Sequence, residues 1–324
     1  MEELEKFVVG VDVGGQTTKI GVVDARGDIL AQNVIRSDVF GTDARAYIDA
    51  LAAAIKECIA KAGKTPDEIR GIGVGAPNGN YYTGEVAYAP NLAWAATGAV
   101  PFSKLLTEAL GGMAVSLTND ANAAAVGEMT YGAAKGMKDF IMITLGTGVG
   151  SGIVVAGKVL YGHDGFAGEL GHVNVVRNGR TCGCGRKGCL EAYCSAVGIA
   201  RTAREWLECS DEPSLLRLID IDNLSSKDIY DAAVRGDKMA LKLFEYTGGL
   251  LGRAFADFIA FSAPEAIVLF GGLARAKEFL YEPMMTAMNA SVLKIWKDKV
   301  RIVFSQLKES DAAILGASAL AWEL

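Results

Sequence analysis

The chain has 324 residues, 51% of them hydrophobic and only seven of them proline, which is the composition of a compact globular protein long enough for two domains. Its formal net charge is -6 with acidic and basic residues interspersed, so binding to nucleic acid through phosphate neutralisation is not favoured. No apolar run reaches the roughly 18 to 20 residues of a membrane span, and the acidic N-terminus MEELEKF is unlike a signal peptide. We expect a cytoplasmic protein with neither a nucleic-acid nor a membrane partner.

Two buried strands joined by a glycine-rich turn open the chain. Residues 7–13 (FVVGVDV) and the run KIGVVD from Lys19 are predicted strands, and a third follows the turn at residues 26–28. The turn GGQTT and the acidic residue before it gather backbone N–H groups, hydroxyls and an ammonium, which suits phosphates and their magnesium ion. An ordinary hairpin would show the same pattern, and the chain has no Walker P-loop motif.

A helix is predicted over residues 43–62 and a further strand from Gly71. The polar and aromatic run NGNYYTGEVAYAPNLAW that follows suits either a wall of a carbohydrate site or a solvated hairpin. A strand from Ala114 then ends at Asn119-Asp120, where an alanine-rich helix begins. Capping of that helix would by itself explain an aspartate at position 120.

A second strand, glycine-threonine turn and strand occurs at IMITLGTGVGSGIVVAG, about 130 residues after the first copy, which indicates two related halves. Each half would present one phosphate-binding hairpin to a shared cleft. Residues 196–262 show helical periodicity, PEAIVLFGGLA predicts a buried strand closed by a glycine pair, and RIVFSQL and DAAILGASALAWEL predict a last strand and a last helix.

The stretch 166–191 holds one of two histidines and three of six cysteines. His172, Cys182, Cys184 and Cys189 form the donor set of a tetrahedral Cys3His zinc site. Reduced surface thiols are the alternative interpretation, and a disulfide framework is not expected at this cysteine density. The other three cysteines, Cys58, Cys194 and Cys209, lie on apolar helical patterns and are predicted core thiols.

The motif G-E-x-G-H followed by C-x-C-G-x-x-G-C-x-E resembles the signature of the ROK family of repressors and sugar kinases, and especially the glucokinases of Bacteroides-type bacteria. The resemblance covers essentially the whole chain. It implies an α/β, two-lobed ATPase fold like that of actin, Hsp70 and hexokinase, with ribonuclease H-like duplicated domains and a cleft between the lobes. The smaller domain would span residues 1–118 plus about 309–324, and the larger one residues 119–308 with the zinc loop 166–191. A homodimer, or a tetramer, is also implied.

The resemblance implies ATP-dependent phosphorylation of a hexose at its 6-hydroxyl, with glucose as the main expected substrate. It also implies a magnesium ion that accompanies ATP and a structural zinc ion. The same catalytic residues would also serve a kinase for N-acetylmannosamine, fructose or allose. A phosphoryl donor other than ATP, such as polyphosphate, also remains open. A repressor would need a helix-turn-helix before the first strand, which begins at about residue 7.

Roles for individual residues follow from the same resemblance. Asp120, in the motif N-D-A-N, would be the catalytic base. The sugar-binding residues would be Asn91, Asn119, Asp120, Glu169, His172 and Glu191. The nucleotide-binding residues would be Asp12, Gly14, Gly15, Thr17, Thr18, Lys19, Gly146, Thr147, Gly148, Gly271 and Gly272. Two departures from the family pattern, Gln16 and residues 78–84, leave part of the phosphate and sugar contacts unassigned.

Overall fold

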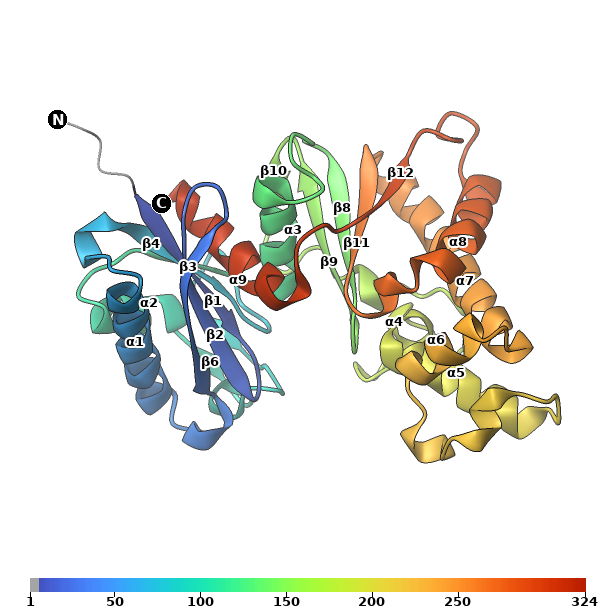
Figure 1. Ribbon diagram of the computed structural model, residues 1–324. Coiled ribbons are helices and arrows are strands. Elements are labelled where there is room, and N and C mark those ends of the chain that lie inside the picture. The colour runs from blue at the N-terminus through green and yellow to red at the C-terminus, as the bar shows by residue number, and fades with distance from the viewer. Residues whose placement is uncertain (1–5) are drawn as a thin grey trace. The chain divides into compact units, whose positions relative to one another are not determined.

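The computed structural model describes residues 6–324, apart from the side chain of Glu309, and consists of two compact units (Figure 1). Unit 1 comprises the described residues up to Met137, Lys158–Gly168 and Gln306–Leu324, and unit 2 comprises Lys138–Gly157 and Glu169–Ser305. These limits differ from the domain boundary expected at residue 118, because the helix that begins at Asp120 packs on the C-terminal helix within unit 1. Residues 1–5, on which the signal-peptide argument rests, lie outside the described residues.

Unit 1 is built on a sheet with the strand order β3-β2-β1-β4-β7. β1 and β3 run antiparallel to β2, whereas β1, β4 and β7 are mutually parallel. Helices α1 and α2 share a hydrophobic core with one face of this sheet, and α9 packs on β1 and β4. The strands are β1 (Phe7–Val13), β2 (Thr17–Val23), β3 (Ile29–Arg36), β4 (Ile69–Gly75) and β7 (Val115–Thr118), and the helices are α1 (Ala44–Lys61), α2 (Phe102–Ala109), α3 (Asp120–Tyr131) and α9 (Glu309–Leu320).

Two glycines explain why α9 can lie directly on the sheet. A Cβ atom at Gly10 of β1 would come within 2.1 Å of the Ile314 carbonyl oxygen, and one at Gly73 of β4 within 1.9 Å of that of Ala317. Any side chain at these positions would push the helix away. The C-terminal helix therefore packs on the N-terminal sheet, as predicted from the sequence.

The sheet of unit 2 runs β9-β8-β11-β12, with β8 and β9 antiparallel and β8, β11 and β12 parallel. This order repeats β2-β1-β4-β7 of unit 1, so the internal duplication predicted from the two hairpins is confirmed. The strands are β8 (Phe140–Leu145), β9 (Val149–Val155), β11 (Ala266–Phe270) and β12 (Arg301–Phe304), and the helices are α4 (Glu191–Cys194), α5 (Ala196–Cys209), α6 (Ser226–Val234), α7 (Lys238–Ser262) and α8 (Lys277–Ser291). Helices α2 and α8 and the short strands β5 (Val86–Ala87), β6 (Ala99–Val100) and β10 (Lys158–Val159) were not predicted.

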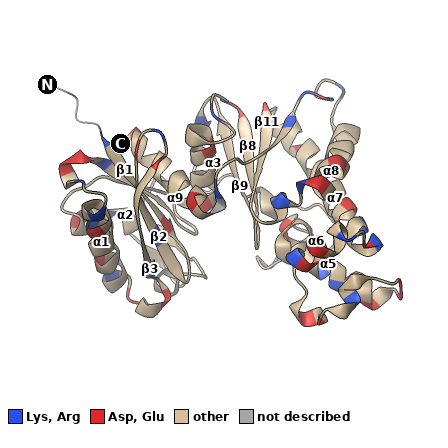
Figure 2. Cartoon of the chain, in the orientation of Figure 1, with Lys and Arg blue, Asp and Glu red and all other residues tan. Residues whose placement is uncertain are grey.

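Charged residues of both signs are interspersed on the elements of both units (Figure 2). Among residues 6–324, no helix combines the length and the apolar character that a membrane crossing requires. Cys58 and Cys194 are buried as predicted, but the prediction for Cys209 was wrong, because the last residue of α5 is exposed.

Candidate functional site

Two carboxylates meet at the carboxyl edge of the unit 1 sheet. Asp12, near the end of β1, lies opposite Lys19 of β2 on one side and Gly75 of β4 on the other. Gly75 is in turn opposite Thr118, two residues before Asp120. Because a Cβ atom at Gly75 would lie only 3.7 Å from the Asp120 Cα, the glycine leaves the space between Asp12 and Asp120 free of a side chain.

Desolvation raises the pKa of both acids and so favours their protonated forms. Desolvation, followed by the charge of Asp120, raises the pKa of Asp12 to about 6, and the ammonium of Lys19 opposes this rise. The pKa of Asp120 is also raised, mainly by desolvation, while a hydrogen bond from the Ala121 amide to its Oδ1 (2.9 Å) lowers it. Since Asp120 is exposed in the structure, water moderates that desolvation. A raised pKa in a pair of carboxylates is typical of groups that exchange protons with a substrate.

The helix cap at this junction is Asn119, not Asp120. The Asn119 side chain accepts a hydrogen bond from the Asn122 amide (2.7 Å), and Asp120 is the first residue of α3. Capping as the explanation for Asp120 is therefore wrong. The Asp120 carboxylate is left for another role.

Only some of the residues of the first hairpin that were predicted to contact phosphate are accessible to solvent. Strand alternation puts Lys19 on the face of Asp12, whereas Thr18 points into the core. The Thr18 hydroxyl lies 2.8 Å from that of Ser37 and 2.6 Å from that of Tyr47. The buried position of the Thr18 hydroxyl does not favour a phosphate contact by this side chain, and the assignment of Thr18 stays a prediction.

The segment P-N-L-x-W reaches this hairpin through its backbone. A Cβ atom at Gly15 would come within 2.7 Å of the Asn91 carbonyl oxygen, so the absence of a side chain lets the two segments touch. Asn91 itself is exposed, as are Gln16 and Thr147, whereas Thr17 is half-buried. The structure therefore brings Asn91 beside the first hairpin.

Residues 78–84 form an anchored loop rather than a loose excursion. The buried Asn80 side chain donates to the Asp164 carbonyl (2.6 Å) and accepts from the amides of Tyr82 and Thr83. The ring of Tyr81 stacks on that of Tyr161 with centroids 4.1 Å apart. The segment that departs from the family pattern is thus a rigid part of unit 1.

In unit 2, the glycine pair lies directly beside the second hairpin. Gly271 has φ +105°, and a Cβ atom there would come within 2.6 Å of the carbonyl oxygen of Leu145, the residue before Gly146. Position 271 therefore requires glycine on two grounds. The contact brings the glycine pair 271–272 next to the turn 146–148.

A pocket of about 420 Å³ opens beside this glycine pair. Lys227, Tyr230 and Asp231 of α6 line it at helical spacing, and the Tyr230 hydroxyl donates to Glu278 Oε1 (2.7 Å). Sequence reasoning missed these residues, because a polar helix face is the only signal they leave. The other lining residues are Ser226, Phe244, Gly272, Leu273, Arg275 and Ala276.

The four predicted zinc ligands lie together in unit 2, with their donor atoms all within 4.8 Å of one another. Cys184 Sγ lies 3.7 Å from Cys189 Sγ, and Cys182 Sγ lies 3.8 Å from His172 Nδ1. Zinc–sulfur bonds of about 2.3 Å in a tetrahedron give sulfur–sulfur distances of about 3.8 Å. The donor set therefore fits a tetrahedral zinc ion, and His172 would ligate it through Nδ1.

Two glutamates flank this loop. Glu169 is exposed and directly precedes the short 3-10 helix Leu170–His172. Glu191 begins α4, and its Oε2 accepts a hydrogen bond from the Val149 amide (3.0 Å). Glu191 thus lies against the second hairpin as well as the cysteine loop.

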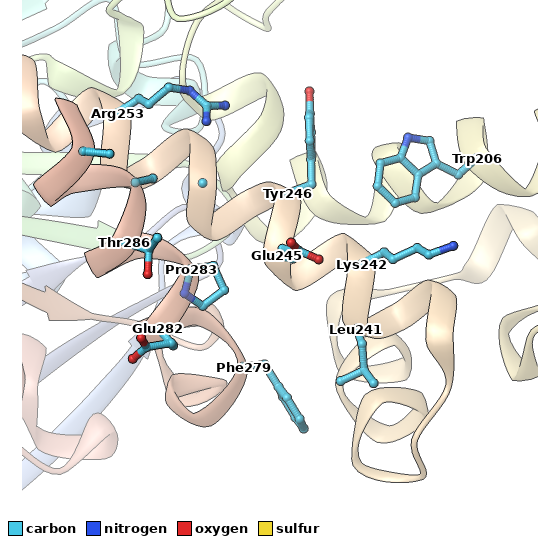
Figure 3. A pocket seen from close by; sticks show the side chains of 13 residues that line it. Trp206, Leu241, Lys242, Glu245, Tyr246, Arg253, Phe279, Glu282, Pro283 and Thr286 are labelled. Carbon is cyan, nitrogen blue, oxygen red and sulfur yellow. The ribbon is translucent and has the colours of Figure 1, made fainter.

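A larger groove of about 840 Å³ lies elsewhere on unit 2 (Figure 3). Helices α5, α7 and α8 line it with aromatic residues such as Trp206 and Tyr246 and with charges of both signs. None of the predicted site residues lines this groove, so it is not part of the candidate site.

The ROK family model matches residues 8–323 of the chain. The chain therefore belongs to the ROK family. It is 36% identical over 318 residues to a glucokinase of Halalkalibacterium halodurans, covering 96% of this chain and 94% of that protein. A ROK family glucokinase from Streptomyces griseus, solved with glucose and AMPPNP, superposes with a TM-score of 0.78 at 32% identity, covering 98% of this chain and all of the other.

Transcriptional regulators of the same family are less similar in sequence, although one superposes with a TM-score of 0.87 at 26% identity. The xylose repressor of Caldicellulosiruptor bescii is 26% identical over 314 residues, which are 97% of this chain and 77% of that protein. The fold is the duplicated ATPase fold of the ROK sugar kinases, as predicted from the sequence.

Proposed function

We propose that this protein is an ATP-dependent glucokinase that transfers a phosphoryl group to the 6-hydroxyl of glucose. The observation that carries the proposal is the Asp120 carboxylate. It follows β7 at the sheet edge, is not used as a helix cap, and has a raised pKa beside Asp12. Glucokinases that align with nearly the whole chain support glucose as the substrate.

Asp120 acts as the general base. Its carboxylate accepts the proton of the sugar hydroxyl as that oxygen forms its bond to phosphorus. The carboxylate also orients the hydroxyl for in-line attack, and positioning of this kind supplies much of the rate enhancement in phosphoryl transfer. Asn119, whose side-chain oxygen caps α3, has an amide nitrogen left to donate to a neighbouring sugar hydroxyl.

The nucleotide is held by the two hairpins and by the pocket beside Gly272. The backbone N–H groups of Gly15, Thr147 and Gly148 donate to phosphate oxygens, since those of Gly14 and Gly146 already donate to the carbonyls of Thr17 and Gly148. Thr17, Lys19 and Thr147 add side-chain donors. A magnesium ion would neutralise the charge on the phosphates, and the Asp12 carboxylate, which interacts with the charges of Asp120 and Lys19, would hold it. Tyr230, Lys227 and Arg275 then line the space for the adenosine.

We assign the contacts with the hydroxyls of the hexose to Asn91, Asn119, Glu169, His172 and Glu191. His172 can contribute while it ligates a metal, because Nδ1 faces Cys182 and leaves Nε2 available.

We assign the Cys3His group to a structural zinc ion, held by His172, Cys182, Cys184 and Cys189. Zinc bound there would close the loop and stabilise the fold. The four donors fill a tetrahedron and leave no position for substrate, which is the mark of a structural rather than a catalytic site.

We further propose that the protein acts as a homodimer in the cytoplasm and has no nucleic-acid partner. Figure 2 shows Lys and Arg interspersed with Asp and Glu along the described elements, which supports the absence of a nucleic-acid partner. Light scattering behind a sizing column should give twice the chain mass, and a monomer mass at micromolar concentration would contradict the dimer.

The proposal is tested by ADP release from magnesium ATP with a panel of hexoses that includes glucose, mannose, fructose, allose and N-acetylmannosamine. We expect kcat/KM to be highest for glucose. A strong preference for another hexose would overturn glucose as the substrate while leaving the kinase chemistry in place. Failure with every hexose would overturn the kinase and favour a regulator.

A further inference from the structure

Both ends of the zinc loop converge on one residue of the second hairpin. Val149, the first residue of β9, donates its amide hydrogen to Glu191 Oε2 at 3.0 Å. Its carbonyl oxygen faces Gly171, where a Cβ atom would come within 2.0 Å. Gly171 precedes the ligand His172 and Glu191 follows the ligand Cys189, so the peptide groups of Val149 are held from both ends of the loop.

The turn before Val149 is contacted by the same segment. A Cβ atom at Gly148 would lie 2.4 Å from Glu191 Oε2, so the carboxylate rests directly against the backbone of the turn. The Ala196 amide at the start of α5 donates to the Gly146 carbonyl at 2.8 Å. Residues 191–196, which begin two residues after Cys189, thus contact the turn at both of its glycines.

The second oxygen of Glu191 faces the metal loop. Glu191 Oε1 lies 3.5 Å from Cys182 Sγ, and the side chain is half-buried. One carboxylate therefore touches a zinc ligand with one oxygen and the phosphate hairpin with the other. The hydrogen bond from the Val149 amide is charge-assisted and therefore stronger than one between neutral groups, whereas a zinc-bound thiolate at Cys182 would make only a packing contact with Oε1.

We propose that Glu191 is a positioning residue for the phosphoryl donor: its carboxylate fixes the Gly146–Gly148 turn to the Cys3His loop, and thereby sets the affinity for ATP. This role is separate from the sugar contact assigned to Glu191 above, and it rests on the proposed function only in taking the turn as a phosphate site. The amides of the turn bind phosphate tightly only if they are held in one conformation. Loss of the Glu191 link releases them.

The test measures the dissociation constant of magnesium ATP by calorimetry in the absence of sugar. Bound zinc is determined for each variant by metal analysis. Glu191→Ala removes the acceptor, whereas Glu191→Gln keeps an oxygen that can accept from the Val149 amide. Gly148→Ala retains Glu191 but drives a methyl group into its carboxylate. The control is Gly183→Ala, which lies between two cysteines of the Cys3His loop and has open space around it.

We expect Glu191→Ala and Gly148→Ala to weaken ATP binding roughly tenfold, the value for one lost hydrogen bond to a charged group. The dissociation constant of Glu191→Gln for magnesium ATP should stay within a few fold of the wild-type value. That of Gly183→Ala should equal the wild-type value. The double variant should bind no more weakly than Glu191→Ala alone, because the carboxylate that the methyl group would strike is gone.

Unchanged ATP affinity in Glu191→Ala, with only sugar binding lost, would overturn the inference and leave the proposed kinase intact. Absence of ATP binding by the wild type would instead overturn the proposed function. If Glu191→Ala fails to fold or to hold zinc, Gly148→Ala decides, since it changes neither Glu191 nor a zinc ligand. Normal ATP affinity in that variant would then contradict the role of the link.

Discussion

At the scale of single residues, the candidate site depends on which side chains are absent. Gly75 separates Asp12 from Asp120 without filling the space between them, and the two carboxylates therefore interact. A like charge and desolvation both oppose ionisation, so the folded protein holds a proton on Asp12 that the unfolded chain releases more readily. The ionised Asp12 carboxylate is therefore expected to lower the free energy of unfolding.

Replacement of Asp12 by Asn tests that cost. Because folding raises the pKa of Asp12 from 3.8 to about 6, this group favours the folded state below about pH 4, and the stability is lost as pH rises through about 6. Asp12→Asn should therefore be more stable than the wild type above pH 6 by about 1 to 2 kcal/mol, less than the full rise in pKa would give, since water reaches the side chain.

Urea unfolding from pH 4.5 to 8, without nucleotide or magnesium, measures this difference. The advantage of the variant should grow up to about pH 6 and stay level above it, while kinase activity falls sharply. A constant difference at every pH, or a variant less stable at pH 8, would contradict the shifted pKa of Asp12.

At the scale of elements, a glycine at the end of one strand allows close contact with the backbone at the end of its neighbour. Gly271 closes β11 against the end of β8 and has a positive φ, whereas its neighbour Gly272 has open space around it and no such backbone conformation. The two residues look equivalent in the sequence. Only the first is required by the packing.

Gly271→Ala and Gly272→Ala form a matched pair. The first should lower the free energy of unfolding by roughly 1 to 3 kcal/mol, since the methyl group meets the Leu145 backbone in a strained conformation. The second should stay within about 0.5 kcal/mol of the wild type. Equal effects in chemical denaturation would show that strand β11 does not end as described.

The cysteine loop is the element that the metal should hold together. Cys184→Ser should lower bound zinc below one ion per chain and lower the thermal midpoint with it, because structural zinc contributes directly to folding. Cys209→Ser is the control, since Cys209 is also exposed but lies outside the ligand group. Full zinc occupancy in Cys184→Ser would show that the ligand assignment is wrong.

The sequence predicted the elements whose signal is local. The two hairpins, helix α1 and the grouping of His172 with three cysteines followed from periodicity, turn residues and donor spacing. The orientation of Thr18 was missed because strand register decides it, and the cap at Asn119 was missed because a shift of one residue exchanges the two roles. Lys227 and Tyr230 join the site only through the fold of unit 2.

At the scale of the whole molecule, the proposed chemistry is divided between the duplicated halves. Unit 1 carries the base Asp120 with the first hairpin, and unit 2 carries the second hairpin, the pocket beside Gly272 and the cysteine loop. Duplication explains the two hairpins, whereas Asp120 lies in unit 1 and the cysteine loop in unit 2.

The most direct measurement of this account compares the wild type with Asp120→Asn in an assay that detects glucose 6-phosphate formed from glucose and magnesium ATP. We predict turnover by the wild type and a kcat lower by about two to four orders of magnitude in the variant. Glucose affinity should stay close to the wild type, and the thermal midpoint should not fall, since Asn119 still caps α3. Turnover by Asp120→Asn at the wild-type rate would contradict the assignment of the base, and no glucose 6-phosphate from either protein would contradict the proposed reaction.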